Sequence, residues 1–513
     1  MSEAEDLGKR EAELRAARQA GLAALRAAGA DPFATTRYEV TAHAADLVAQ
    51  HADLSAEGEP PPERFGLAGR IMALRKQGKK VYFADLWDRT GKLQLYVRED
   101  VVGAETFALF EQTDLGDLAG ATGSLFRTKT GELTLRVESL AILAKALVPL
   151  PDKWHGLVDV EKRYRQRYVD LIVNEHVRGI FIARSRIVAE MRRFIDAKGF
   201  LEVETATLLN VAGGAAARPF RTHSNALDIP LELRIATELN LKRLIVGGLE
   251  RVYEIGRIFR NEGIDTTHNP EFTMLELYAA YWSVAEMMEF NEELVAHLVR
   301  FLHGTDRLQV GEHEISFVRP FARIAYLEAM QRHGALERAE LLDPPGAARI
   351  LAKLGLPPSP THGHALDKIF ERVVEPNLVQ PTFVYDYPLA ISPLSKRKPG
   401  DPDIVERYEL FAANFEVANA FTELNDPEDQ RARFEAQIAL RKAGDEEIPP
   451  PDWDFVHALE YGMPPTAGIG IGVDRLVMLL TDNASIREVI LFPMQRPLAP
   501  GHPPETDETA KAI

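Results

Sequence analysis

The chain contains 513 residues, of which 46% are hydrophobic and 27% charged, with a formal net charge of −17 and no cysteine. These values are typical of a globular protein of about two to four domains, and the missing cysteines exclude disulfides, thiolate metal sites and cysteine nucleophiles. No run of about 18 apolar residues and no apolar secretion signal occur, so we expect a cytoplasmic protein with no membrane partner. Because the net charge is acidic, any nucleic-acid partner would have to be bound by local basic patches.

The first part of the chain predicts a helical extension and a small barrel. Residues 1–64 contain two helical patterns and end in a proline-rich segment. Residues 65–147 then contain about five short alternating runs separated by turn signals, which is typical of a small β-barrel. Such barrels bind single-stranded nucleic acid by stacking bases on aromatic side chains, so the candidate contacts are Arg70, Phe83 and Gln94. The alternative, that Phe83 and Tyr96 are core residues, is equally compatible with the segment.

A boundary follows at residues 148–174, where we expect a linker. Prolines there precede a basic cluster that consists of Lys162, Arg163, Arg165 and Arg167. This cluster is either a solvated helix face or a nucleic-acid patch. A helical pattern then runs from Glu175 to Gly199, where glycine acts as a stop signal, and the segment LEVETATLL after it predicts a short strand.

The segment FRNEGIDTTHNPEFTMLELY, residues 259–278, predicts two strands joined by a polar loop. Side chains at alternate positions of a strand lie on one face. The residues that would share one face here are Arg260, Glu262, Phe272, Met274, Glu276 and Tyr278. Buried charges are tolerated only when they are paired or bound to a ligand. This face is therefore typical of a site for a flat, anionic ligand that carries an amine.

A second unusual cluster lies in the segment VERYELFAANFEVANAFTELND, where Glu409, Glu416 and Glu423 recur among apolar residues. Acids that share a cavity repel each other unless a cation lies between them. Strict alternation would place Asn419 and Glu423 on one face of a strand and Glu416 on the other. A single site therefore requires a bulge near Ala418.

The segment TAGIGIGVDRLVMLLTD predicts a strand followed by a helix. Gly468, Gly470 and Gly472 alternate, so one face of this strand would be bare and a flat ring could lie against it. The glycine spacing differs from that of the dinucleotide fingerprint, and no Walker loop occurs in the chain. If the chain binds a nucleoside triphosphate, we expect arginines on an antiparallel sheet to hold it, with Arg475 in the first turn of the helix.

Two segments carry little predicted chemistry. Residues 304–380 are less regular, and we expect an insertion with small helices. Residues 498–513 contain proline and glutamate and are expected to be a disordered tail.

Several blocks of the sequence resemble class II aminoacyl-tRNA synthetases. These are EVET at 202–205 for motif 1, FRNEG at 259–263 with HNPEFTMLELY at 268–278 for motif 2, and GIGVDR at 470–475 for motif 3. The blocks GGAAARPF, ELNLKRL, VGGLERVYEIGR and TELNDPEDQ narrow the resemblance to the bacterial-type lysyl-tRNA synthetases (class IIb). The implied fold is α+β: an N-terminal OB-fold barrel that binds an anticodon, at 65–147, and a class II catalytic domain at 175–497, whose antiparallel sheet is flanked by helices.

The resemblance implies a lysine–tRNA ligase that acts in two steps. L-Lysine and ATP would form lysyl-adenylate and pyrophosphate, and the lysyl group would then pass to the 3′ end of tRNA(Lys). ATP is thus an implied substrate, Mg²⁺ an implied metal, and a homodimer through motif 1 is expected. Two alternatives stay open: the same scaffold specific for aspartate or asparagine, and a non-catalytic synthetase-like paralogue that binds RNA.

Residue roles implied by the resemblance form four sets. The ATP-binding set is Arg260, Glu262, His268, Asn269, Phe272 and Arg475, of which Arg260 and Arg475 are also catalytic. The lysine-binding set is Gly214, Glu238, Glu276, Tyr278, Asn419, Phe421 and Glu423. The magnesium ligands are Glu409 and Glu416, and the anticodon contacts are Arg70, Phe83 and Gln94. The chain departs from the family pattern at Ala206, where proline is usual, and at Ala420, where a glycine is expected and alanine would narrow the pocket slightly.

Overall fold

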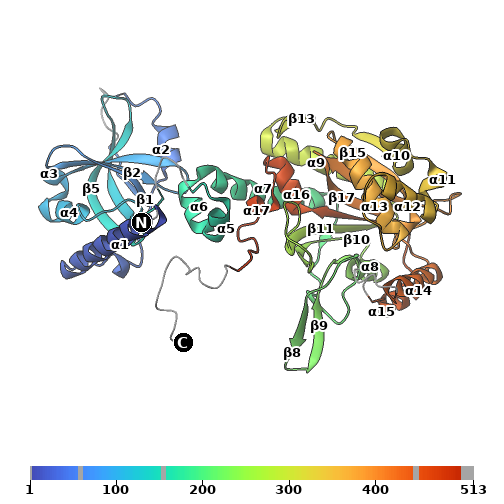
Figure 1. Cartoon of the computed structure of the whole chain (residues 1–513). Helices are drawn as coiled ribbons and strands as arrows, with labels where there is room; N and C mark the ends of the chain where they lie inside the picture. Colours follow the sequence, from blue (N-terminus) through green and yellow to red (C-terminus); the bar gives the residue numbers. More distant parts are fainter. Residues whose placement is uncertain (1–2, 56–61, 152–156, 443–449, 498–513) are drawn as a thin grey trace. The chain divides into compact units, whose positions relative to one another are not determined.

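The computed structural model describes residues 3–55, 62–151, 157–442 and 450–497. The chain forms two compact units, residues 1–158 and 159–513 (Figure 1), and each is described here by itself. The segment 498–513, expected to be disordered, lies outside the described residues. Across the described ranges, no helix has the length and apolar character that a membrane crossing requires.

The first unit contains the predicted barrel. Two helices, α1 (Glu3–Ala27) and α2 (Ala44–Gln50), and the short η1 (Pro32–Ala34) precede it. Five strands then close in the order β1-β2-β3-β5-β4. Their bounds are Phe65–Lys76 for β1, Val81–Trp87 for β2, Lys92–Arg98 for β3, Leu118–Arg127 for β4 and Leu133–Ala144 for β5. Two short helices, α3 (Glu99–Val102) and α4 (Ala104–Phe110), lie between β3 and β4. Alternating apolar side chains such as Leu67, Leu86 and Leu95 fill the interior.

The second unit is built on an eight-stranded sheet in the order β14-β15-β16-β17-β18-β11-β10-β6. Its inner strands are antiparallel, and only the pairs β14/β15 and β10/β6 at the two edges are parallel. The bounds are Leu201–Glu202 (β6), Arg251–Phe259 (β10), Glu271–Ala280 (β11), Ala322–Ala325 (β14), Thr382–Pro388 (β15), Ile404–Ala412 (β16), Phe415–Thr422 (β17) and Thr466–Gly472 (β18). A separate three-stranded sheet, in the order β7-β9-β8, consists of β7 (Leu208–Leu209), β8 (Arg221–Ser224) and β9 (Ile229–Leu233).

One face of the sheet is covered by helices and forms the main core. The helices of this core include α7 (Glu175–Ala197), α9 (Val284–His303), α16 (Val473–Leu480) and α17 (Ile486–Val489). They pack on apolar residues such as Leu275, Ile469 and Ala420. The opposite face carries α8 (Glu238–Val246), α14 (Pro427–Lys442) and α15 (Trp453–Glu460) at one end. Because one face is used for packing, polar side chains of the central strands point to the other.

Residues 304–380 contain the small helices that were expected, and they contain strands as well. They form the hairpin β12 (Arg307–Val310) and β13 (His313–Ser316), the edge strand β14, and the helices α10 (Tyr326–Gly334), α11 (Arg338–Leu341), α12 (Pro344–Lys353) and α13 (His362–Val373). In Figure 1 these helices are grouped beside β15, and they share a core with Val384 and Phe411 of the sheet. The insertion therefore extends the sheet and covers part of its polar face.

The predicted hairpin and the predicted bulge are both confirmed. β10 and β11 pair from Arg251↔Ala279 to Phe259↔Glu271, with the polar loop between them. On β17, Ala418 pairs with Leu410 and Glu416 pairs with Phe411, so Val417 has no counterpart on β16. This extra residue turns Glu416 to the same side as Asn419 and Phe421, while Val417 and Ala418 are buried in the core.

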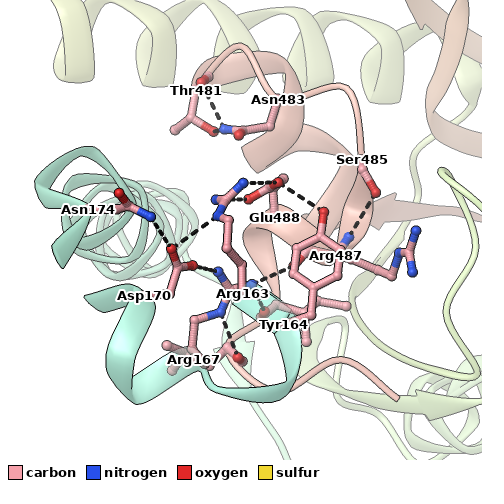
Figure 2. Close-up of polar contacts among 12 residues, drawn as sticks. Arg163, Tyr164, Arg167, Asp170, Asn174, Thr481, Asn483, Ser485, Arg487 and Glu488 are labelled. Carbon is pink, nitrogen blue, oxygen red and sulfur yellow. Dashed lines mark hydrogen bonds and ion pairs between the residues drawn. The ribbon is translucent and has the colours of Figure 1, made fainter. Parts of the chain in front are cut away.

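The basic cluster in the expected linker 148–174 belongs to the second unit and is used to hold it together. It lies on α5 (Val160–Arg165) and α6 (Arg167–Val173). Figure 2 shows Arg163 and Tyr164 directed at Glu488 of α17: the guanidinium donates to both carboxylate oxygens at 3.1 and 2.8 Å, and the hydroxyl donates at 2.9 Å. The fully buried Arg167 donates to Asp170 at 2.5 Å and to the carbonyl oxygens of residues 487 and 491. Arg163 and Arg167 therefore form neither a solvated face nor a free nucleic-acid patch.

We predict that Arg167→Met destabilises the second unit by about 3–5 kcal/mol, because it removes the buried cation from Oδ2 of Asp170 and the donor to the carbonyl oxygens of residues 487 and 491, while Arg163 and Asn174 still reach only Oδ1 of Asp170. Arg165→Met is the matched control: this side chain is 29% exposed, pairs with Glu161 at 3.6 Å and donates to the Arg496 carbonyl at 2.7 Å at an exposed position, so its loss should cost less than about 1 kcal/mol. Urea unfolding of both variants measures the difference, and equal losses would contradict the role of Arg167.

The bare face predicted for β18 is confirmed, and its three glycines differ in the space beside them. A Cβ on Gly468 would lie 2.2 Å from Glu423 Oε1 and 2.3 Å from Tyr278 Cε1, whereas on Gly472 its nearest neighbour would be Arg475 Cβ at 3.7 Å. The side chains of Tyr278 on β11 and of Glu423, which follows β17, thus converge over Gly468.

We therefore expect Gly468→Ala to destabilise the protein by about 1–3 kcal/mol through overpacking, and Gly472→Ala to change stability by less than about 0.5 kcal/mol. Thermal unfolding of the two variants compares them directly. A Gly468→Ala protein as stable as Gly472→Ala would show that Glu423 and Tyr278 do not occupy this space.

Candidate active site

A cavity of about 490 Å³ opens on the polar face of the central sheet. Its floor is formed by β11, β18, β17 and β16, and its walls by the β10–β11 loop, the start of α8 and part of α13. Every ligand residue predicted in the second unit lines it, with one exception. The lining residues are Gly214, Glu238, Arg260, Glu262, His268, Asn269, Phe272, Glu276, Tyr278, Glu409, Glu416, Asn419, Phe421 and Arg475. The exception is Glu423, which is 1% exposed and lies behind the wall.

Register explains why residues from distant segments meet here. On the bare strand β18, Gly470 pairs with Glu276 on one side and with Asn419 on the other. Gly468 likewise lies between Tyr278 and Phe421. Side chains of β11 and β17 therefore project over backbone that has no side chain of its own, and Tyr278 of β11 lies against Gly468.

One end of the cavity is cationic. Arg260, at the start of the β10–β11 loop, lies 5.2 Å over the ring of Phe272, and its Nε donates to the Ile235 carbonyl at 3.3 Å. Burial lowers the pKa of Arg260, while the nearby charge of Glu262 raises it. Arg475 of α16 lies close enough to Arg260 to lower its pKa, and it donates to Glu416 Oε2 at 3.1 Å. Two guanidinium groups with few partners form a site suited to phosphate oxygens, which match their planar geometry.

The motif-2 loop adds further polar groups to this end. Arg475 Nη2 lies 3.3 Å from His268 Nε2, and the other ring nitrogen of His268 lies 2.9 Å from Asp265 Oδ2. Asn269 is buried and donates to the Glu271 carbonyl at 2.6 Å, whereas its Oδ1 has no partner within the described chain. A buried amide oxygen without a partner is costly unless a ligand donates to it.

Asp474, the residue before Arg475 in the sequence, fixes the position of Arg475. Asp474 is 1% exposed and accepts from the Thr273 backbone N–H and from Arg184 Nη1, both at 2.6 Å. These bonds tie the first turn of α16 to β11 and α7. Arg475 therefore leaves a fixed helix start and projects into the cavity.

The other end is acidic and closed. Glu238, Glu276 and Tyr278 are 6%, 3% and 3% exposed. Glu276 accepts from the Thr237 backbone N–H at 2.8 Å and from the Tyr278 hydroxyl at 3.3 Å. Burial raises the pKa of Glu276 to about 7, because the Thr237 N–H offsets only part of the desolvation and Glu238 adds repulsion. Gly214, at φ +88°, brings its backbone against Glu238 and Ala236.

Arg407, which the sequence did not single out, connects Asn419 to Glu409, one of the two predicted metal ligands. It donates to Asn419 Oδ1 at 3.0 Å and to Glu409 Oε1 at 2.5 Å. Burial raises the pKa of Glu409, Arg407 lowers it, and the charge of Glu416 raises it again, which reflects the closeness of the two carboxylates. The alternation R-x-E at 407–409 was the available signal, because it places both residues on one face of β16.

Glu409 and Glu416 fit a magnesium ion that is held partly by a substrate. Both are hard carboxylate donors on one wall of the cavity, and Mg²⁺ is usually bound by one or two carboxylates together with phosphates and water. No group of three or more candidate ligands occurs among the described residues. The protein by itself therefore offers two ligands and leaves the others to phosphate and water.

Two other side chains correct the sequence analysis. Asp367 of α13, in the insertion expected to carry little chemistry, lines the cavity. Desolvation raises its pKa to about 7, Arg407 lowers it and Glu409 raises it. Ala420, expected to narrow the pocket, is fully buried in the core on the opposite face of the sheet. The register places its neighbours Asn419 and Phe421, and not Ala420, at the cavity.

In the barrel, a ladder of aromatic rings lies on the outer surface. The ring centroids of Phe83 and Tyr96 are 4.9 Å apart and those of Tyr96 and Phe126 are 5.5 Å apart, with Arg136 5.1 Å over Phe126. These rings are half-buried and lie outside the barrel core, so Phe83 and Tyr96 are not core residues. Gln94 accepts from Thr134 at 3.0 Å, whereas Arg70 donates to the Gly116 carbonyl at 2.6 Å and is partly engaged within the barrel.

Comparison with known proteins agrees with both units. The family described as "tRNA synthetases class II (D, K and N)" matches residues 159–496, and the family described as "OB-fold nucleic acid binding domain" matches residues 66–143. The chain is 53% identical to a protein of Moorella thermoacetica over 489 residues, which cover 95% of this chain and 98% of that protein. It is 52% identical to a protein of Bacillus subtilis over 92% of this chain and 95% of that protein. Both relatives are named lysine–tRNA ligase.

The expected architecture of an OB-fold barrel followed by a class II sheet is thus confirmed by fold and by sequence similarity together. The class II match extends over all the strands that form the cavity floor. The chain therefore belongs to the class II tRNA synthetases (D, K and N), with an OB-fold nucleic acid binding domain ahead of its synthetase domain.

Proposed function

We propose that this protein is a lysine–tRNA ligase, which activates L-lysine with ATP and then transfers the lysyl group to the 3′ end of tRNA(Lys). The observation that carries the proposal is one cavity with arginines at one end and the buried acids Glu238 and Glu276 at the other. A cationic side chain needs acids at the closed end of its pocket, and a triphosphate needs cations beside it. Relatives that share half of the sequence over nearly the whole chain bear the same name.

The first step takes place between the lysine held at the acidic end of the cavity and the ATP held at the cationic end. A carboxylate oxygen of lysine attacks the α-phosphorus of ATP, a new O–P bond forms, and the bond to the β-phosphate breaks so that pyrophosphate leaves. The nucleophile is already ionised, so no strong protein base is required, and positioning with charge neutralisation supplies the catalysis. Arg260 holds the α-phosphate, and His268 and Arg475 hold the outer phosphate. Phe272 stacks under adenine, Glu262 accepts a hydrogen bond from the adenine amino group, and Asn269 completes the nucleotide set.

A magnesium ion bound by Glu409 and Glu416 would neutralise charge on the phosphate oxygens. Arg407 pairs with Glu409 at 2.5 Å and Arg475 pairs with Glu416 at 3.1 Å. Those pairs hold both carboxylates on the same wall of the cavity.

The lysine pocket is proposed to consist of Gly214, Glu238, Glu276, Tyr278, Asn419, Phe421 and Glu423. Acids at the closed end receive the side-chain ammonium, and Phe421 with Tyr278 lines its apolar stem. An enzyme for aspartate or asparagine would need a basic group facing the cavity where Glu238 lies, and a non-catalytic paralogue would be expected to lack some of Arg260, Glu409, Glu416 and Arg475. This chain retains all four.

The barrel is proposed to bind the anticodon of tRNA(Lys) by stacking a base on Phe83, with Gln94 and Arg70 contacting base edges. The half-exposed aromatic ladder and the exposed Arg136 support this use of the outer surface. A homodimer and a cytoplasmic location remain predictions.

Lysine-dependent ATP–pyrophosphate exchange is the direct test. We expect exchange with L-lysine and none with aspartate or asparagine, and we expect Arg260→Lys to reduce kcat/KM by about 100-fold or more, because a lost electrostatic contact in such a site costs about 2.7–4 kcal/mol. Exchange that depends on aspartate, or none with any amino acid, would refute the proposal.

The KM for lysine should also depend on pH through Glu276. A bound ammonium favours the ionised form of this carboxyl, whose pKa is raised to about 7. Below that pH, lysine binding must expel a proton, so the KM for lysine should rise by up to about tenfold per pH unit as the pH falls from 7 to 5.5. Above pH 7 this dependence should disappear.

Glu276→Gln is the corresponding control, since it has no proton to lose: its KM for lysine should be higher at pH 8 but change less between pH 7 and 5.5. The KM for ATP in both proteins reports any general effect of acid. Identical slopes for wild type and Glu276→Gln would exclude Glu276 as the titrating group.

A further inference from the structure

The chain carries an ammonium group of its own at the acidic end. Lys242 lies one turn after Glu238 on α8, and its side chain is 0% exposed. Its Nζ lies 2.5 Å from Glu238 Oε1 and also pairs with Glu423 Oε2. The same nitrogen lies 5.3 Å from the ring centroid of Phe421 and 5.8 Å from that of Phe455.

Lys242 approaches the acids from behind the cavity wall. Glu238 and Phe421 line the cavity, whereas neither Lys242 nor Glu423 does. The ammonium is bound to Oε1 of Glu238, so Oε2 of that carboxylate is the oxygen left for a ligand in the cavity. Lys242 therefore does not fill the space that a substrate side chain would enter.

The balance of charge at this end explains why a buried cation is needed. Glu238, Glu276 and Glu423 bring three carboxylates together, and Lys242 brings one ammonium. Two carboxylates held side by side without a cation share a proton, since both cannot stay ionised. The shared proton would remove negative charge from the closed end of the pocket, where the ammonium of the substrate must bind.

Groups on four elements face this ammonium or its carboxylate partners. They are Glu238 of α8, Glu423 next to β17, Glu276 and Tyr278 of β11, and Arg407 of β16. Burial raises the pKa of both Glu238 and Glu423, and for each the charge of Lys242 is the largest influence in the opposite direction. The charge of Arg407 also lowers the pKa of Glu238, but less than the charge of Lys242 does.

We propose that Lys242 is a specificity-determining positioning residue of the lysine pocket: it holds the carboxylates of Glu238 and Glu423 together, offsets part of their repulsion and turns one oxygen of Glu238 to the substrate. The inference rests on the proposed function, because it assigns the cation to the recognition of lysine. Lys242 acts through Glu238 and does not touch the substrate.

Lys242→Met tests this role, since it keeps a stem of similar length and removes the charge. In lysine-dependent ATP–pyrophosphate exchange at pH 7, we expect the KM for lysine to rise at least tenfold while the KM for ATP changes less than twofold. Raising the pH to 8.5 should recover part of the loss relative to wild type, because the paired acids then lose their shared proton. Lys242→Arg, which keeps the charge, should recover more of the affinity than Lys242→Gln.

Lys198→Met is a matched control, because it also breaks a lysine–glutamate pair, to Glu293 at 2.8 Å, at a partly exposed position. Its KM for lysine should equal that of wild type at every pH. Thermal unfolding of all variants separates a structural effect from a change in recognition, and the double variant Lys242→Met/Glu423→Gln restores charge balance. If Lys242→Met does not fold, the double variant and Lys242→Arg carry the comparison.

Several outcomes would overturn the inference. An unchanged or lower KM for lysine in Lys242→Met would show that Lys242 does not support the pocket or that it competes with the substrate. An equal rise of the KM values for lysine and ATP, or a loss that does not depend on pH, would indicate a merely structural role. Failure of wild-type protein to exchange with lysine would refute the proposed function itself, whereas exchange by wild type with an unaffected Lys242→Met refutes only the role of Lys242.

Discussion

The need to neutralise buried charge governs the catalytic half of this protein. Carboxylates and guanidinium groups are gathered on one face of the sheet, and groups with low exposure cannot remain charged without partners. The structure supplies these partners in a fixed order along the cavity: Lys242 for Glu238 and Glu423, Arg407 for Glu409, and Arg475 for Glu416. Each pair offsets negative charge near the cavity, and Glu238, Glu409 and Glu416 still line the space that a charged substrate would enter.

The sheet accommodates this arrangement through two departures from regular strands. Alternating glycines leave β18 without side chains on the cavity side, so the side chains of β11 and β17 on either side of it reach over this part of the cavity floor. A single extra residue, Val417, then turns Glu416 to the face that Asn419 and Phe421 occupy. Both departures would weaken an ordinary sheet, since they remove packing and interrupt pairing. Here the apolar core on the opposite face, with α7, α9 and α16, compensates for them.

Rigidity around the site comes from ion pairs that connect distant segments. Arg163 and Tyr164 of α5 bind Glu488 of α17, and the backbone N–H of Ile486 donates to the Thr266 carbonyl at 2.7 Å. Helix α17 is thus attached both to α5, at the start of the second unit, and to the motif-2 loop. This attachment limits the movement of α17 and of the loop that carries His268, so Arg475 and His268 stay within reach of each other.

The sequence by itself determined the order of the two units, the motif-2 hairpin, the bare strand and the residue types of the site, because periodicity and glycine spacing are local properties of the chain. It also indicated that a bulge near Ala418 was required, but only the strand pairing located it at Val417. Tertiary structure alone decided that Lys242 is the counter-ion of Glu238 and Glu423, that Arg407 joins Asn419 to Glu409, and that Asp367 reaches the cavity from the insertion. It decided also that Arg163 and Arg167 are used for packing and are not free to bind RNA. The physical reason is that the cost of burying a charge depends on which groups surround it in space, and such neighbours come from segments that are remote in sequence.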